Sequence, residues 1–278
     1  MSYRTIKFSS FTIIILFVIT CSTNPEEGAC GDGYFIDSGV NRISDIESRV
    51  QKDIDHDMNV GIFLAYGQSN SENYGELGYT VTNEIFQFYN DSTYLYADPS
   101  LGGTGHGGSV WGMVGDKLVD NGNFNQVVFA VAGWGGKTIS ELSNGDYYDY
   151  FIGNYCQLTN RFGKIDGILF HQGESDSWIG NYDYYNDFKK FYQKMNDSGV
   201  ESPFYLSLAS FCNSQVDSNL LSIQNQIIID YENVLRGPNT DLLIDPQYRL
   251  SDNCHFSLIG LQEFSDMWIE SITNKSEL

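Results

Sequence analysis

VGIFLAYGQSN, residues 60–70, is an apolar run that ends at Gly67 and is followed closely by Ser69. The continuous apolar run at positions 62–64, which is partly β-branched and aromatic, is typical of a strand that is covered on both faces. A glycine after such a strand lets the chain turn sharply, so we expect Ser69 at the carboxyl edge of a sheet, where open α/β folds bind ligands. Ser69 is therefore a candidate nucleophile. The alternative is that it only caps the segment that follows.

A second apolar run, residues 125–132, ends in a turn that contains Gly135 and Gly136. Glycines between a strand and a helix let backbone N–H groups approach a ligand without a Cβ in the way. In an acyl-transfer enzyme, such a turn supplies a hydrogen-bond donor to the oxyanion. The alternative is an ordinary strand-to-helix turn.

A third apolar run, residues 165–170, leads into the polar cluster HQGESD at 171–176. Gln172 offers an amide donor, while the carboxylate of Glu174 is suited to orienting a histidine or binding a substrate hydroxyl. The alternative is a metal site made by His171, Glu174 and Asp176. We expect none, because the three lie in one short loop and the other histidines supply no companion ligand.

Asp252 and His255 lie in a turn directly before a segment, 256–268, whose apolar residues follow helical spacing. An aspartate three residues ahead of a histidine can accept a hydrogen bond from the ring nitrogen that points away from the substrate. This contact fixes the tautomer and stabilises the imidazolium as it forms. A single such pair is weak evidence, but together with the three earlier motifs it predicts a serine hydrolase.

The set of motifs resembles the SGNH hydrolase superfamily, and within it the sialate O-acetylesterase-like and acetylxylan-esterase-like carbohydrate esterases. The resemblance covers residues from about 60 to 272 and rests on GQSN at 67–70, Gly135 and Gly136, HQGESD at 171–176 and the pair Asp252 and His255. It implies an α/β protein, a three-layer α/β/α sandwich with a central parallel sheet, in the flavodoxin-like form of these hydrolases. The alternation of strands and helices agrees with it.

The resemblance also implies a role for each site residue. Ser69 would be the nucleophile, His255 the general base and Asp252 the group that orients it. The oxyanion donors would be the N–H of Ser69, a backbone N–H at Gly136 or Gly135, and the side chain of Gln172. Lys137 stands where the family usually has threonine, so the choice between the two glycines stays open. Asn70 and Glu174 are left with supporting or substrate-binding roles, although Glu174 competes with Asp252 for the orienting role.

The reaction implied is hydrolysis of an O-acyl ester, with acetate as the expected acyl group, on a sugar or polysaccharide. It needs no cofactor and no metal. One alternative is a lipase-like SGNH enzyme, but we find no long apolar lid segment. Another is an inactive carbohydrate-binding protein on the same scaffold, and the complete set of serine, histidine and aspartate argues against it.

The net charge of the chain excludes some classes of binding partner. The chain of 278 residues has 15 Lys and Arg against 36 Asp and Glu, a formal charge of -21. Such a surface repels nucleic acid and anionic membranes, so we expect neither as a partner. The 19 Tyr and 18 Phe include more rings than a core requires, and exposed rings are one means of stacking on sugars. Most of them are expected to be ordinary packing residues.

The N-terminal residues have the pattern of a targeting segment. Arg4 and Lys7 precede an apolar run, 11–19, that is too short to span a bilayer and right for a secretory signal. Cys21 follows in a context that resembles the lipid-attachment box of bacterial lipoproteins, except for Thr20. We expect a signal peptide at 1–21, a flexible lead-in at 22–42 and one esterase domain at 43–278. The protein is thus expected to be exported. Lipid attachment at Cys21 would be its only membrane anchor, and the alternative is ordinary signal cleavage without an anchor.

The four cysteines after Cys21 are an even number in a compartment that permits disulfides. Three pairings are open, and the alternative is free buried thiols. We favour Cys212 with Cys254, because each adjoins the predicted end of a core strand, and hence Cys30 with Cys156. The remaining elements expected are a fourth strand at 204–209, a short strand at 241–244, and helices at 43–54, 109–118, 182–195 and 219–234.

Overall fold

The computed structural model of the protein describes Cys30 and residues 42–274. Its centre is a seven-stranded sheet with the strand order β3-β2-β4-β1-β5-β6-β7. The strands are β1 (Val60–Gly67), β2 (Ile85–Tyr89), β3 (Ser92–Leu95), β4 (Gln126–Val131), β5 (Gly167–His171), β6 (Phe204–Leu208) and β7 (Val234–Asn239). All neighbours pair in parallel except β2 and β3, so β3 is an antiparallel edge strand.

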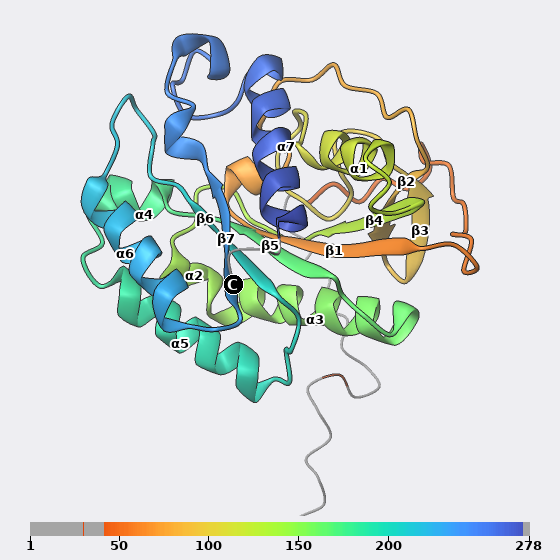
Figure 1. The fold of residues 1–278 in the computed structure, drawn as a ribbon, viewed down its shortest axis with the longest axis horizontal. Helices are drawn as coiled ribbons and strands as arrows, with labels where there is room; N and C mark the ends of the chain where they lie inside the picture. Colours follow the sequence, from red (N-terminus) through yellow and green to blue (C-terminus); the bar gives the residue numbers. More distant parts are fainter. Residues whose placement is uncertain (1–29, 31–41, 275–278) are drawn as a thin grey trace, which may run out of the picture.

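The helices cover both faces of the sheet and give three layers (Figure 1). They are α1 (Trp111–Asp120), α2 (Ile139–Leu142), α3 (Gly145–Phe162), α4 (Glu174–Ile179), α5 (Tyr184–Asp197), α6 (Ser218–Asp230) and α7 (Leu258–Thr273), with single turns η1 (Ser69–Ser71), η2 (Thr240–Leu242) and η3 (Pro246–Tyr248). Alternate residues of β1 face opposite layers: Ile62 and Leu64 pack with α2, α3, α5 and α6, whereas Phe63 packs with α1 and α7. The expected three-layer α/β/α fold is confirmed.

The position of β1 marks the edge of the sheet at which open α/β folds bind ligands. Its neighbours are β4 on one side and β5 on the other, so the strand order reverses at β1. In open α/β sheets the ligand crevice lies at the carboxyl ends of the strands at such a reversal. The segments after β1, β4 and β5 are the ones that carry Ser69, the glycine turn and the HQGESD cluster.

Two of the expected elements are wrong. Residues 43–54 do not form a helix, because their backbone lies along β3: Lys52 donates its N–H to Thr93 at 3.1 Å and Val50 accepts from Leu95 at 2.8 Å. Residues 241–244 do not form a strand. The last strand is β7, which starts at Val234, where helix was expected, and continues across Gly237, where a Cβ would lie 2.8 Å from the backbone of Leu206.

The disulfide prediction is confirmed in both pairs, Cys30 with Cys156 and Cys212 with Cys254. Arg42, the last residue of the expected lead-in, is buried against the domain: its guanidinium lies 3.4 Å from the ring centroid of Tyr150 and donates to the carbonyl of Gly102 at 2.6 Å. The predicted signal peptide, with Cys21, and the rest of the lead-in up to residue 41 lie outside the described residues, apart from Cys30. Within the described part, no helix has the length and apolar character to cross a bilayer.

Candidate active site

Ser69 sits directly beyond the central strand. Gly67 ends β1 with φ +139°, and a Cβ there would lie 2.0 Å from the carbonyl oxygen of His171, so only glycine fits between the two strands. The N–H of Gln68 donates to that same carbonyl at 2.9 Å, and the chain then turns into η1. Ser69 is therefore held at the carboxyl edge of the sheet by backbone contacts with β5.

His255 and Asp252 approach Ser69 from the segment before α7. His255 Nε2 lies 2.9 Å from Ser69 Oγ, and His255 Nδ1 lies 2.6 Å from Asp252 Oδ2. The other carboxylate oxygen of Asp252 accepts the backbone N–H groups of Cys254 at 2.9 Å and His255 at 3.0 Å. Burial alone raises the pKa of Asp252, but these hydrogen bonds outweigh it and the pKa is lowered, so the carboxylate is ionised at neutral pH.

The turn that carries His255 is fixed from two sides. Cys254 is bonded to Cys212, and its carbonyl accepts from the buried guanidinium of Arg249 at 2.6 Å. On the other side, the ring of Tyr74 stacks on the imidazole with the centroids 5.1 Å apart and the planes 24° apart. Tyr74 was not identified from the sequence, since one tyrosine among nineteen carries no pattern.

The glycine turn after β4 lies against the start of η1. The N–H of Trp134 donates to the carbonyl of Gly67 at 2.8 Å, which ties the turn to the end of β1. The N–H of Gly135 donates to Thr104 Oγ1 at 3.1 Å. Gly136 is exposed with φ +72°, and a Cβ built there meets nothing within 4 Å. The two candidate glycines thus differ, because Gly135 is committed to Thr104.

Gln172 differs from the expectation of a free amide. It is fully buried, and its Nε2 donates to the carboxylate of Asp176 in a short contact. The same nitrogen lies 3.3 Å from Gln68 Oε1 and 3.3 Å from the carbonyl of Lys137. Since all three neighbours are acceptors, the amide nitrogen must face them. Gln172 therefore joins the segments after β1, β4 and β5.

Glu174 supports Asn70 rather than His255. Its Oε1 lies 2.8 Å from Asn70 Nδ2 and 2.8 Å from His171 Nε2. Burial alone raises the pKa of Glu174, but the charge and hydrogen bond of His171 and the amide of Asn70 lower it to about 2. Asn70 also donates to the carbonyl of Cys254 at 3.3 Å, next to His255. Within the described residues, no group of three or more His, Cys, Asp and Glu side chains is arranged to hold a metal ion.

A second buried acid, Glu72, follows η1 directly and was not identified from the sequence. It accepts the N–H of Thr104 in a short contact and interacts with the charge of Arg42. Burial raises the pKa of Glu72 to about 8, against the lowering effects of Thr104 and Arg42. Its other carboxyl oxygen is buried without a hydrogen-bond partner.

A comparison with protein families shows which family the chain belongs to. The family described as carbohydrate esterase, sialic acid-specific acetylesterase, matches residues 59–273. The chain belongs to this family. The resemblance to SGNH carbohydrate esterases is confirmed, and the protein is a carboxylic ester hydrolase of a family that acts on carbohydrates.

Solved structures share the fold at low sequence identity. A protein from Arabidopsis thaliana is 16% identical, with 77% of this chain and 98% of that chain covered and a TM-score of 0.60. NanS is 15% identical over 77% of this chain and 96% of its own, with a TM-score of 0.51. A single-residue variant of Axe2, an acetyl xylan esterase from Geobacillus stearothermophilus, is 14% identical over 77% and 96%, with a TM-score of 0.50. No curated protein matches the chain.

Proposed function

We propose that the protein is a serine esterase that removes O-acetyl groups from carbohydrates, with Ser69 as nucleophile, His255 as general base and Asp252 as the group that orients the imidazole. The observation that carries the proposal is the continuous contact of the three side chains, 2.9 Å from Ser69 Oγ to His255 Nε2 and 2.6 Å from His255 Nδ1 to Asp252 Oδ2. These lengths suit hydrogen bonds in which Nδ1 carries a proton and Nε2 is free to accept one.

In the proposed reaction, His255 Nε2 takes the hydroxyl proton of Ser69 while Oγ attacks the ester carbonyl carbon. The tetrahedral intermediate collapses, the sugar hydroxyl leaves with the proton from His255, and Ser69 stays acetylated. Water then enters, gives its proton to His255 and attacks the acyl group, and acetate leaves as Oγ recovers the proton. Asp252 remains ionised throughout and stabilises the imidazolium formed in each half.

We assign the oxyanion contacts to the N–H of Ser69, the N–H of Gly136 and one amide hydrogen of Gln172. Gly136 is favoured over Gly135, because the N–H of Gly135 already donates to Thr104. The amide nitrogen of Gln172 has two hydrogens. Asp176 takes one in the short contact, and the other is shared between two acceptors at 3.3 Å, both at the long end for a hydrogen bond. That second hydrogen is the one we assign to the oxyanion.

The test is the initial rate of p-nitrophenyl acetate hydrolysis by the wild type, Ser69→Ala and His255→Asn. We expect each variant to lose at least about a thousandfold in kcat, because the three side chains act as a unit. His106→Asn is the matched control, since His106 is exposed and outside the four motifs. Its rate should equal that of the wild type. A folded Ser69→Ala variant with more than about a tenth of the wild-type rate contradicts the proposal.

We also infer that the protein is exported. Both disulfides, Cys30 with Cys156 and Cys212 with Cys254, need an oxidising compartment to persist. The signal-like residues 1–21 support the same inference. Intact-mass measurement of the mature protein distinguishes the two modes of processing: a chain that begins at Cys21 with added acyl mass is a lipoprotein, and a chain that lacks Cys21 is an ordinary secreted product.

A further inference from the structure

Three large apolar side chains are exposed within five residues at the end of α4. Trp178, Ile179 and Tyr182 have exposed fractions of 70%, 63% and 86%, whereas Trp111 and Trp268 are fully buried. Single exposed apolar residues are ordinary, but a local group of them beside a site indicates a contact surface. We call Trp178 and Tyr182 the aromatic rim.

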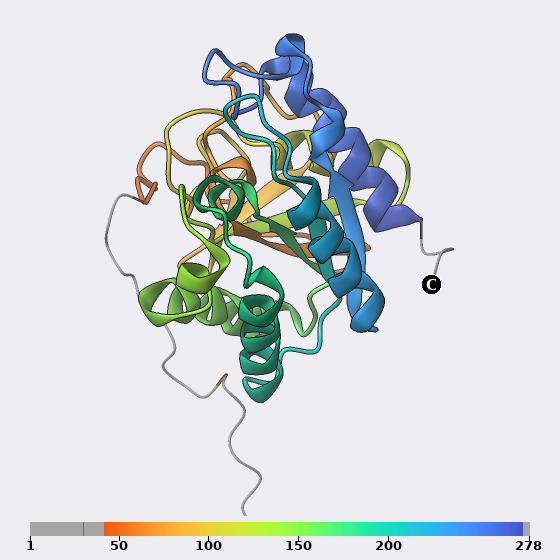
Figure 2. The same ribbon diagram turned by 90° about the vertical axis from the view of Figure 1, so that its left-hand side faces the viewer.

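The aromatic rim lies close to Ser69, because the first turn of α4 contacts both of its neighbours in the chain. The N–H of Ser175 donates to Gln68 Oε1 at 3.0 Å, and Glu174 accepts from Asn70 at 2.8 Å. Trp178 follows Ser175 by three positions and Glu174 by four, hence it lies on the same side of the helix and about 4.5 to 6 Å further along its axis. Figure 2 looks onto this edge of the sheet.

Tyr182 is held beside α4 by a short turn. The helix ends at Ile179 and is capped by Gly180, which has φ +66°, and Asn181 Nδ2 then donates to Asp176 Oδ1 at 2.6 Å. Asp176 also accepts from the N–H of Ile139 at 2.8 Å, so the turn is joined to the segment after β4. Both rings of the aromatic rim are thus carried by backbone that is fixed to the site.

The cations near the site are all committed to partners within the protein. Arg249 donates to the carbonyls of Leu243, Cys254 and Thr240 at 2.6–2.8 Å. Lys137 pairs with Glu141 at 2.9 Å, and Arg42 is buried against Tyr150. Each of these three cations thus has a partner within the protein that the carboxylate of an anionic sugar would have to displace.

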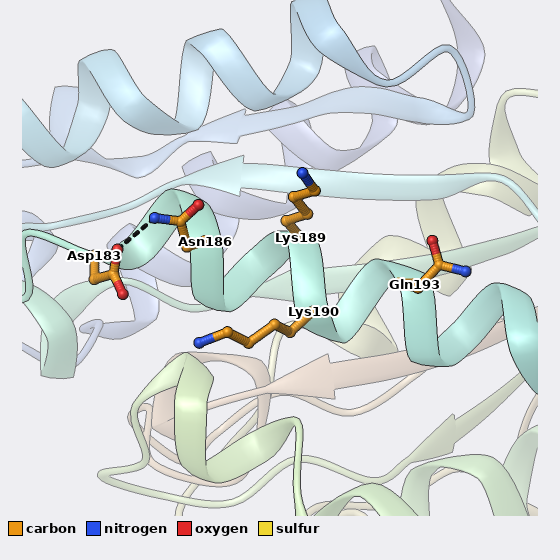
Figure 3. Close-up of a pocket in the computed structure, with 5 residues that line it drawn as sticks. All are labelled: Asp183, Asn186, Lys189, Lys190 and Gln193. Atoms are coloured by element: carbon orange, nitrogen blue, oxygen red, sulfur yellow. Dashed lines mark hydrogen bonds between the residues drawn. The ribbon is translucent and has the colours of Figure 1, made fainter.

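Exposed ammonium groups do occur on α5, which begins two residues after Tyr182. Lys189 and Lys190 line an open hollow of about 630 Å³ with Asp183, Asn186 and Gln193 (Figure 3). The carboxylate of Asp187 pairs with Lys190 at 3.2 Å, and Asp183 is an acid in the lining of the hollow itself. With a formal charge of -21 on the whole chain, the long-range field disfavours a negatively charged sugar.

We propose that the substrate of this esterase is an acetylated sugar chain without charge, one ring of which stacks on Trp178 and Tyr182. This inference rests on the proposed function. Aromatic faces bind the C–H surfaces of a pyranose ring without any charge, while the committed cations leave a sialic acid or uronic acid carboxylate unpaired. The substrate class therefore differs from the sialic acid in the family description.

The experiment measures kcat/KM of the wild type on p-nitrophenyl acetate, an acetylated xylo-oligosaccharide and an O-acetylated sialic acid. We expect the xylo-oligosaccharide to be preferred over the sialic acid by at least about tenfold, with a rate on the xylo-oligosaccharide that does not change with salt between about 20 and 500 mM. A preference for the sialic acid overturns the inference. The case against it is strongest if the double variant Lys189→Ala, Lys190→Ala loses that preference. Absence of activity on all three esters refutes the proposed function instead.

The second arm tests the aromatic rim with Trp178→Ala, Tyr182→Ala and the matched control Ile229→Ala, an exposed apolar residue on α6. The ratio of kcat/KM on the xylo-oligosaccharide to that on p-nitrophenyl acetate should fall about tenfold in the rim variants and stay constant in the control. A constant ratio in the rim variants overturns the inference. So does a constant ratio together with loss of a dimer in sedimentation, which assigns the rim to a second copy of the chain.

Discussion

Asp252 and Glu174 are the two carboxylates that the sequence offers for orienting His255, and the structure separates their contacts. Asp252 lies 2.6 Å from the ring, whereas Glu174 binds Asn70 and His171. We expect Asp252→Asn to lower kcat on p-nitrophenyl acetate by two to four orders of magnitude, roughly, because the amide no longer fixes the tautomer. Glu174→Gln keeps an acceptor for Asn70 and should cost less than about tenfold. The reverse order of the two losses refutes this assignment.

Glu72 leads to a prediction about pH and stability. Its pKa is about 8 in the fold and 4.5 as the ordinary value, so the carboxyl costs nothing below pH 4.5, destabilises the fold progressively between pH 4.5 and 8, and adds no further loss above 8. Glu72→Gln cannot ionise. We expect its Tm to fall less between pH 5 and pH 9 than that of the wild type, by roughly 5 °C or more. Glu263→Gln, at an exposed position, serves as the control. If the Tm of Glu72→Gln depends on pH as that of the wild type does, the claim that Glu72 is buried and neutral is contradicted.

The residues proposed as oxyanion donors show the limit of residue-level prediction. The sequence indicates Gln172 by its place after an apolar run. The hydrogen bonds of its amide to Asp176 and to the carbonyl of Lys137 are seen only in the structure. Likewise, nothing in the sequence shows that Thr104, from the loop after β3, takes the N–H of Gly135. The contacts of Lys137 and Thr104 join residues more than thirty positions apart, and no spacing rule reports them.

At the scale of elements, the disulfide between Cys212 and Cys254 joins the segment after β6 to the turn that carries His255. Closing a loop of 42 residues stabilises the fold by about 4 kcal/mol in the chain-entropy model. We expect Cys212→Ala with Cys254→Ala to lower kcat/KM at least about tenfold, because the neighbour of His255 loses its tether. The pair Cys30→Ala with Cys156→Ala is the control. It should lower Tm with little change in kcat/KM, and equal losses in both pairs argue against the tether.

Strands with a continuous apolar run could be predicted from the sequence. Segments whose conformation depends on contacts with other strands could not. β1, β4, β5 and β6 are buried along their whole length and stand out in the sequence for that reason. β7 has no such run, because the exposed Arg236 interrupts it and Gly237 is required by the close approach of β6. Residues 43–54 have helical spacing of apolar residues, yet Ile46 and Val50 are exposed because the backbone pairs with β3.

At the scale of the whole molecule, the meeting of the motifs at one candidate site could be predicted because of the topology. Parallel strands joined by helices deliver all their carboxyl ends to one edge, so motifs that follow β1, β4 and β5 must meet. The distances between the side chains, the antiparallel edge strand β3 and the buried position of Arg42 depend on contacts across the chain. They follow from the packed structure rather than from any local pattern.

The central claim is that Ser69 is the nucleophile activated by His255, and covalent labelling tests it most directly. The protein is treated with a fluorophosphonate, which reacts with activated serines, and the adduct is located by peptide mass spectrometry. We predict one adduct per chain, on Ser69, with labelling slowed at least about a hundredfold in His255→Asn. An adduct on another serine, or hydrolysis of p-nitrophenyl acetate by an enzyme whose Ser69 stays unlabelled, would contradict the account.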